Sequence, residues 1–207
     1  MLLGGVPGVA PAKVVILGGG VSGTAAAEIA CGMRAEVTVI DKSLPRLRQL
    51  DALFGGRLKT VFSTAASIEA AVASADLLIG AVLVPGAAAP RLVTRSMIRT
   101  MRPGAVVVDI AIDQGGCIET SRPTTHADPT YMDEGVLHYC VTNMPGAVAR
   151  TSALALNNAT LPYVRALAQD GFEAACGKDP GLAAGLNVSA GRVVHAAVAA
   201  ALGLATR

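Results

Sequence analysis

The sequence predicts an α/β fold of the Rossmann type: a doubly wound parallel sheet followed by a helical appendage at the carboxyl end. Two observations lead to this prediction. Short β-branched runs alternate with helical patterns up to residue 142, and a glycine-rich turn joins the first run to an Ala-rich helical pattern. Most of the runs are almost continuously apolar, which is typical of strands covered on both faces, as in a parallel sheet.

Six strands are expected from these runs. Each is short, rich in Val and Ile, and bounded by polar, glycine or proline residues. The expected strands are residues 13–18, 36–41, 57–62, 76–83, 105–111 and 136–141.

Helix start and stop signals separate the strands. Ser43 precedes a segment with leucines at helical spacing, which Gly55-Gly56 should end. Ser67 is a candidate cap for a short helix, and Thr94 is one for a helix that Pro103-Gly104 should terminate. This order of elements predicts a series of βαβ units.

After the last expected strand the βαβ pattern stops. Thr151 or Ser152 is expected to open a helix, and residues 160–162 to form a fresh cap with proline in the first turn. Residues 187–195 are expected to form a small hairpin that precedes an Ala-rich helix. We expect residues 150–207 to be an appendage whose apolar faces need another surface.

Charge and composition exclude several classes of function. The net charge is +2, from 17 basic and 15 acidic residues with no basic block, and aromatic residues make up 3%. Neither nucleic acid nor an acidic membrane surface is therefore an expected partner. The three histidines, His126, His138 and His195, are scattered, so we expect no metal site and assign each to a loop or to packing.

The sequence contains no clear membrane helix, signal peptide or paired-cysteine redox motif. The apolar segment 77–90 is shorter than the roughly 20 residues that a membrane helix needs, and it carries Pro85. Residues 1–13 have no basic region ahead of an apolar one, as a signal peptide would. The four cysteines form no CxxC pair and are expected to be reduced thiols. A soluble, cytoplasmic protein is expected.

The strongest motif is Gly18-x-Gly20-x-x-Gly23, which follows an apolar strand and opens a helical pattern. Glycines at these positions permit a tight turn, let the backbone approach a pyrophosphate and allow close packing of helix on strand. A glycine-rich turn alone is a weak signal, but Asp41 closes the next expected strand. An acid there can accept hydrogen bonds from a ribose diol and repel a 2′-phosphate, which favours NAD over NADP.

Lys42 and Arg46 are cationic neighbours of Asp41 and would weaken the exclusion of a 2′-phosphate slightly. The alternative is a purely structural turn with a solvent-facing aspartate.

The ends of the fourth, fifth and sixth expected strands should border the same crevice, because ligands bind at the carboxyl ends of parallel strands. Residues 81–87, 110–116 and 140–147 would then line a pocket. Asp113 could act there or could merely stabilise its turn. Asp109 is expected to be a satisfied structural acid, and Met144 either covers a nicotinamide or fills the core.

Several long segments resemble the NAD-binding and C-terminal part of bacterial alanine dehydrogenase, a family related to the transhydrogenase NAD-binding domain. They include LLGGVPGVAPAKVVILGGGVSGT, DKSLPRLRQLDALFGGR and ADLLIGAVLVPGAAAPRLVT. The blocks IDQGG…SRPTTH and HYCVTNMPGAV favour alanine dehydrogenase over the transhydrogenase. The resemblance covers almost all of the chain.

The resemblance implies a role for each matching position. Asp113 matches the active-site aspartate of the family. The cofactor contacts that it implies, beside the motif residue Gly23, are Gly18, Gly20, Val21, Asp41, Arg46, Ser63, Val82, Leu83, Ile110, Ala111, Ile112, Asp113, Arg122, Val141, Thr142, Asn143 and Met144.

The resemblance also implies an activity: NAD-dependent oxidative deamination of L-alanine to pyruvate and ammonia by a homo-oligomer, commonly a hexamer. Family members carry an N-terminal substrate domain with an active-site lysine and histidine, which we expect this chain to lack. Residues 1–149 would be the NAD-binding domain, and residues 150–207 would pack on that substrate domain. The alternatives are a non-catalytic NAD-binding module that needs a separate chain, or a transhydrogenase-like component.

Overall fold

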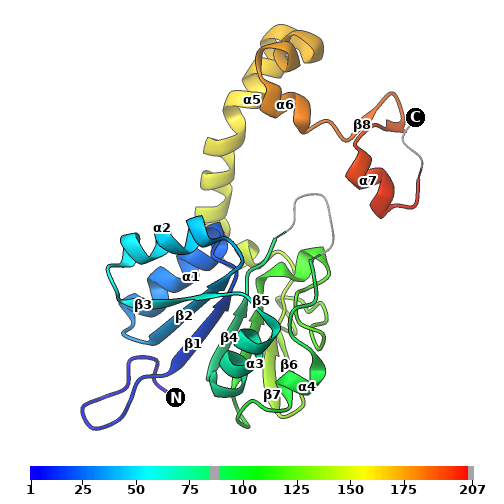
Figure 1. The fold of residues 1–207 in the computed structure, drawn as a ribbon. Helices are drawn as coiled ribbons and strands as arrows, with labels where there is room; N and C mark the ends of the chain where they lie inside the picture. The colour runs from blue at the N-terminus through cyan, green and yellow to red at the C-terminus, as the bar shows by residue number, and fades with distance from the viewer. Residues whose placement is uncertain (84–88, 205–207) are drawn as a thin grey trace. The chain divides into compact units, whose positions relative to one another are not determined.

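The computed structural model describes residues 1–83 and 89–204 (Figure 1). The chain divides into two compact units, Met1–Thr142 and Asn143–Arg207. The Pro85-containing part of the loop predicted to line the pocket after the fourth strand lies outside the described residues.

The first unit is built on a seven-stranded sheet with the order β3-β2-β1-β4-β5-β7-β6. All neighbouring strands run parallel except the β6–β7 pair. The strand order reverses between β1 and β4, and the predicted Rossmann-type fold is thereby confirmed. The strands are β1 Lys13–Leu17, β2 Glu36–Asp41, β3 Leu58–Phe62, β4 Leu77–Gly80, β5 Val106–Asp109, β6 Thr130–Asp133 and β7 Val136–Tyr139.

Helices connect the parallel strands: α1 Val21–Gly32, α2 Leu44–Phe54, α3 Ala65–Ser74, α4 Arg95–Ile98 and the 3₁₀ helix η1 Ile110–Gln114. The predicted caps of α2 are confirmed, since the Ser43 side chain accepts a hydrogen bond from the backbone of Arg46 and Gly55 closes the helix in the left-handed conformation. Thr94 caps α4 as predicted, but the helix ends at Ile98, ahead of the predicted stop at Pro103-Gly104. The prediction for α3 was wrong: Thr64 is the cap, and Ser67 completes a capping box with it.

The core of this unit lies on both faces of the sheet. Val15 and Leu17 of β1 belong to one buried cluster, whereas Val14 and Ile16 belong to the other. This division follows from the alternation of side chains along a strand. Helices α1 and α2 cover one face, while α3 and α4 cover the other (Figure 1).

Strands β4 and β7 end at Gly80 and Tyr139, earlier than the predicted residues 83 and 141, and two further features of the sheet differ from the prediction. Strand β6 was not predicted, although the sequence Asp133-Glu134-Gly135 between two alternating runs is a hairpin signal. Strand β5 ends at Asp109 rather than at residue 111. The reason is that the Asp109 carboxylate accepts a hydrogen bond from the backbone N–H of Ala111, which turns the chain into η1.

The second unit contains helices and a small hairpin: η2 Met144–Val148, α5 Ala149–Lys178, α6 Pro180–Ala184, β8 Val188–Ser189, β9 Arg192–Val193 and α7 Ala196–Ala201. The predicted hairpin and final helix are confirmed.

The predicted start of the long helix was wrong. Helix α5 begins at Ala149, ahead of Thr151, and it continues through Pro162. Thr160 is not a new cap, because its hydroxyl donates to the carbonyl of Leu156 from inside the helix. The break comes at Gly171, with φ 74° and ψ 170°.

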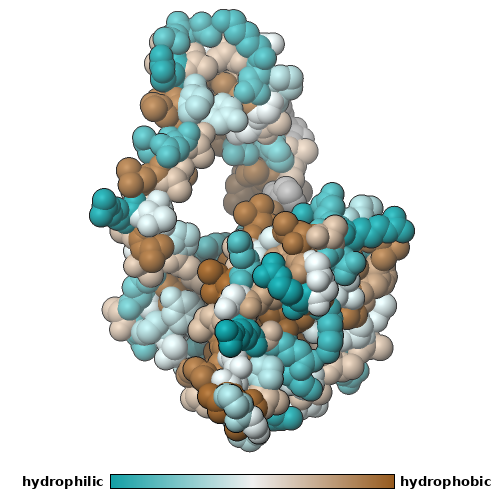
Figure 2. All heavy atoms as spheres, turned by 90° about the vertical axis from the view of Figure 1, so that its left-hand side faces the viewer, coloured by the Kyte–Doolittle hydropathy of each residue, from teal (hydrophilic) through white to brown (hydrophobic). Residues whose placement is uncertain are grey.

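The second unit exposes many of its apolar side chains. Among its described residues, Ala175 and Ala199 are the buried apolar ones, and Figure 2 shows apolar side chains on its surface among hydrophilic ones. Exposed examples on α5 are Leu154, Leu156 and Val164. None of the helices described is both long and apolar enough to cross a membrane.

Candidate functional site

A glycine turn joins β1 to α1, and its backbone leaves no room for larger side chains. Gly18 has φ +97°, and a Cβ added to it would lie 2.7 Å from the carbonyl oxygen of Ala81. A Cβ on Gly23 would overlap the carbonyl oxygen of Gly18. At Gly20, by contrast, a Cβ would meet no atom within 4 Å. The turn is therefore closed toward the protein and open at Gly20, where a ligand can approach the backbone.

The amino end of α1 faces this opening. Gly20 is the N-cap and makes no side-chain capping bond, and Val21, the first helical residue, is 91% exposed. The first N–H groups of a helix lack partners within the helix and carry a partial positive charge. Such an end favours an anion, as the pyrophosphate of a dinucleotide would be.

Asp41 lies beside the glycine turn at the end of β2. Its carboxylate accepts hydrogen bonds from the backbone N–H groups of Gly19, at 2.7 Å, and Ser43, at 2.8 Å. Each carboxylate oxygen has a second lone pair, so the group can still accept bonds from a ribose diol. Ser63 follows β3 next to it, and its N–H donates to the backbone carbonyl of Asp41.

Arg46 reaches from α2 back to the same turn. Its Nε donates to the carbonyl of Gly19 at 2.6 Å, and an Nη donates to the hydroxyl of Thr24 at 2.7 Å. The other Nη donates to Gln49. In this structure the guanidinium holds the turn in shape, a role that the sequence did not suggest.

The end of β4 lies next to the turn. A Cβ at Gly18 would come within 3.1 Å of a methyl of Val82, so this half-buried side chain packs beside the glycine. Leu83 follows and is 66% exposed. Both residues are placed at the carboxyl edge of the sheet, where the family resemblance expects cofactor contacts.

The end of β5 holds two acids in different environments. Asp109 is fully buried and also accepts hydrogen bonds from the backbone of Cys117 and Ile118. The expected satisfied structural acid is thus confirmed. Asp113 lies in η1 rather than in a loop, and it is exposed.

The neighbours of Asp113 along the chain differ in exposure. Ile110 and Ala111 are half-buried, and Ile112 is buried with 3% exposure. Asp113 is therefore the member of this turn whose side chain solvent or a substrate can reach.

The remaining predicted residues flank the β6–β7 hairpin in the chain: Arg122 precedes β6, and residues 141–144 follow β7. Thr124 pairs with Val141 beyond the end of β7, and Arg122 comes two residues before Thr124 on an exposed stretch. Val141 is buried and Thr142 is half-buried. Asn143 and Met144 begin the second unit.

Burial shifts the acid–base behaviour of two side chains near this edge. It raises the pKa of the Cys117 thiol, with the nearby Asp109 charge adding to the effect. It also lowers the pKa of His138, which lies fully buried in β7. Cys117 therefore stays a protonated thiol and His138 a neutral imidazole, in keeping with the packing role expected for this histidine.

Thr24 and Tyr131 were not predicted as site residues, but each contacts an arginine that was: Thr24 bonds to Arg46, and the Tyr131 ring lies against Arg122. Thr24 stands one position after the last motif glycine and pairs with Arg46, which only the folded chain brings near. The signal for Tyr131 would have been the unpredicted β6 hairpin.

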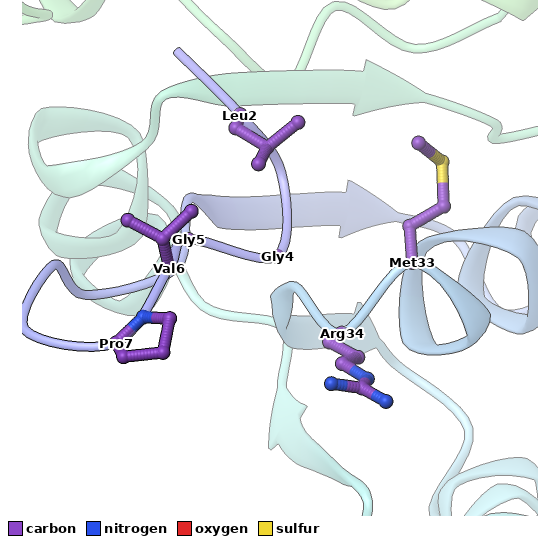
Figure 3. Close-up of a pocket in the computed structure, with 7 residues that line it drawn as sticks. All are labelled: Leu2, Gly4, Gly5, Val6, Pro7, Met33 and Arg34. Carbon is purple, nitrogen blue, oxygen red and sulfur yellow. The ribbon is translucent and has the colours of Figure 1, made fainter.

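A separate pocket lies at the opposite edge of the sheet. It has a volume of about 440 Å³ and is lined by residues from the segment 2–7 together with Met33 and Arg34 (Figure 3). These residues precede β1 and follow α1, away from the carboxyl ends of the strands. Within residues 1–83 and 89–204, no cluster of three or more His, Cys, Asp or Glu side chains could hold a metal ion.

The sheet order, the glycine turn and the acid at the end of β2 together define a dinucleotide-binding domain of the Rossmann class. The family profile "Alanine dehydrogenase/PNT, C-terminal domain" matches residues 1–196, and the chain belongs to this family. A pyridine nucleotide is accordingly its cofactor class.

Similar proteins support the assignment of the chain to this family. The chain is 64% identical over 204 residues to alanine dehydrogenase of Halomonas elongata, covering 99% of this chain and 55% of that protein. Alanine dehydrogenase of Mycolicibacterium smegmatis is 56% identical over 204 residues, again covering 99% of this chain and 55% of that protein. The chain thus spans about half the length of the curated relatives it matches.

Solved structures show the same fold. An L-alanine dehydrogenase superposes with a TM-score of 0.88 at 57% identity, over 98% of this chain and 56% of that one. A transhydrogenase from Sinorhizobium meliloti gives a TM-score of 0.72 at 29% identity, over 90% of this chain and 50% of that one.

Proposed function

We propose that this chain is the NAD-binding part of an NAD-dependent L-alanine dehydrogenase, which converts L-alanine, NAD⁺ and water to pyruvate, ammonium, NADH and a proton. The observation that carries the proposal is the position of Asp41, whose carboxylate is fixed on the glycine turn by the N–H of Gly19. The high identity to proteins named alanine dehydrogenase supports the choice of substrate.

The described residues fit the cofactor. Gly18, Gly20, Val21 and Gly23 would hold its pyrophosphate at the amino end of α1, and Asp41 would accept from the adenosine ribose. The other proposed contacts are Arg46, Ser63, Val82, Leu83, Ile110, Ala111, Ile112, Asp113, Arg122, Val141, Thr142, Asn143 and Met144.

NAD, when bound, supplies a hydride acceptor for the Cα of L-alanine. Loss of the hydride leaves an iminium, which water hydrolyses to pyruvate and ammonium. Asp113 is exposed at the strand end, and its carboxylate would counter the iminium charge and orient the attacking water. The neighbouring Ile112 and Val141 are buried and would keep the floor of the site apolar.

Residues 1–149 would act as the NAD-binding domain, and residues 150–207 would pack on a substrate domain that supplies further catalytic groups. The exposed leucines of α5 support this role. We place the protein in the cytoplasm as a homo-oligomer.

Catalysis is tested in a chimera that joins this chain to the portion of the Halomonas elongata protein that it does not match. L-Alanine should drive NADH formation, measured by absorbance. Asp113→Asn should lower turnover by about 100-fold or more, because it removes a catalytic charge. Asp128→Asn changes an exposed carboxylate of a neighbouring loop and should retain activity. Absence of alanine-dependent NADH formation in the unsubstituted chimera would refute the proposed substrate.

Cofactor choice is tested on the 207-residue chain by calorimetric titration. NADPH should bind at least about tenfold more weakly than NADH, because its 2′-phosphate meets the Asp41 carboxylate. Asp41→Ala should narrow this difference by weakening NADH and relieving the repulsion. Equal affinities for the two nucleotides in the unsubstituted chain would contradict the choice of NAD.

A further inference from the structure

Tyr131 lies under the side chain of Arg122. The guanidinium carbon of Arg122 stands 3.9 Å from the centroid of the Tyr131 ring. At this distance a cation is attracted to the face of an aromatic ring, and an arginine guanidinium stacks well on such a face.

The Tyr131 hydroxyl fixes the backbone on both sides of Ser121. It donates to the carbonyl of Thr120 at 2.8 Å and accepts from the N–H of Arg122 at 2.8 Å. Burial raises the pKa of the Tyr131 hydroxyl, so it keeps its proton and remains a donor. One residue thus sets both the main chain and the side chain of Arg122.

Tyr131 is in turn supported by His138. The two rings stack with centroids 5.0 Å apart and an interplanar angle of 19°. His138 is fully buried, and its Nδ1 lies 3.0 Å from the carbonyl of Val136, which requires the proton on that nitrogen. The Nε2 then accepts from the hydroxyl of Thr120 at 2.8 Å. Thr120 is therefore held by both rings.

The hairpin that carries Tyr131 is fixed at its turn as well. Arg95 pairs with Asp133 at 2.6 Å and with Glu134 at 2.9 Å, while Arg99 pairs with Glu134. These charges hold the pKa of Glu134 low, at about 2. Tyr131 therefore projects from an element tied to α4 and to the neighbouring strand.

Arg122 itself has a location suited to an anionic ligand. Residues 120–124 run beside the carboxyl end of β7, and the backbone of Thr124 bonds to Cys140 and Thr142. Strand β7 is parallel to β5, so this stretch borders the same edge as Asp113. An exposed arginine on this edge can reach a bound dinucleotide.

We propose that Tyr131 is a positioning residue for the proposed function: stacked on His138, it holds the Arg122 guanidinium in the orientation that contacts bound NAD. The inference rests on the proposed NAD site and adds a residue that does not itself touch the nucleotide. A rigid aromatic support lowers the conformational entropy that arginine would otherwise lose on binding.

The test titrates NADH into the 207-residue chain and its variants by calorimetry. Arg122→Ala and Tyr131→Leu should each weaken NADH binding by about tenfold, because the first removes a charge-assisted contact with the nucleotide and the second releases the side chain that makes this contact. Tyr131→Phe keeps the ring and loses the hydroxyl, so it should weaken binding by only about threefold. The double variant Arg122→Ala/Tyr131→Leu should bind no more weakly than the weaker single variant, because both changes remove one contact.

A second measurement separates positioning from stability. The Nε–H signal of Arg122 in nuclear magnetic resonance should report an ordered side chain in the unsubstituted chain and in Tyr131→Phe, and a mobile one in Tyr131→Leu. Tyr139→Leu removes a ring from the adjacent strand of the same hairpin and should leave both NADH affinity and this signal unchanged.

Each contrary result has a distinct meaning. If Tyr131→Leu bound NADH as tightly as the unsubstituted chain while Arg122→Ala bound it weakly, the positioning role would be wrong. It would also be wrong if the fold-loss of NADH affinity in the double variant equalled the product of the fold-losses in the two single variants. If the unsubstituted chain bound no NADH, the proposed function would fail, and the inference with it.

Discussion

Gly23→Ala should abolish measurable NADH binding by this chain and lower its stability. The added methyl would overlap the carbonyl oxygen of Gly18, a backbone atom that cannot move without displacing the turn. Overpacking of this kind costs about 3 kcal/mol, and a displacement of about 1 Å in a binding site costs on the order of 100-fold in function. Calorimetric titration with NADH and thermal unfolding measure the two effects.

Gly32→Ala is the matched control in the same helix. Gly32 ends α1, and a Cβ there would meet no atom within 4 Å. Alanine is favoured over glycine in helices by up to about 1 kcal/mol, so this variant should bind NADH normally and be at least as stable. Normal NADH affinity in Gly23→Ala would show that the glycine turn does not hold the cofactor.

Asp109→Ala should reduce the free energy of unfolding by at least about 3 kcal/mol, since each buried N–H that loses its acceptor costs about 1–3 kcal/mol. Three backbone N–H groups, those of Ala111, Cys117 and Ile118, lose their acceptor. The site is fully buried, and water cannot easily replace the carboxylate. Urea unfolding followed by circular dichroism measures the change.

Two further variants define this effect. Asp109→Asn keeps one oxygen acceptor but brings an NH₂ group toward backbone donors, so it should reduce the free energy of unfolding by less than Asp109→Ala does. Asp51→Ala removes an exposed carboxylate from α2 and should change stability by less than about 0.5 kcal/mol. If Asp109→Ala reduced the free energy of unfolding by less than about 1 kcal/mol, the Asp109 carboxylate would not be needed to stabilise the end of β5.

The local parts of the fold and the site were predictable. The doubly wound parallel sheet followed from the alternation of apolar runs with helical patterns, and the caps at Ser43 and Thr94 followed from residue type and spacing. Errors arose where two readings of one local pattern competed. Thr64 and Ser67 both suit a cap, and Pro162 suits either a first turn or a helix interior.

Sequence by itself determined the glycine turn and the acid after the second strand, because both depend on spacing along a strand, a turn and a helix. Only the tertiary structure decided what the polar side chains do. Asp109 finds donors at Cys117 and Ile118, and Arg122 finds the ring of Tyr131, through loops whose paths no short pattern encodes. The physical reason is that hydrogen bonds and ring contacts between distant residues depend on distance and orientation in the folded chain.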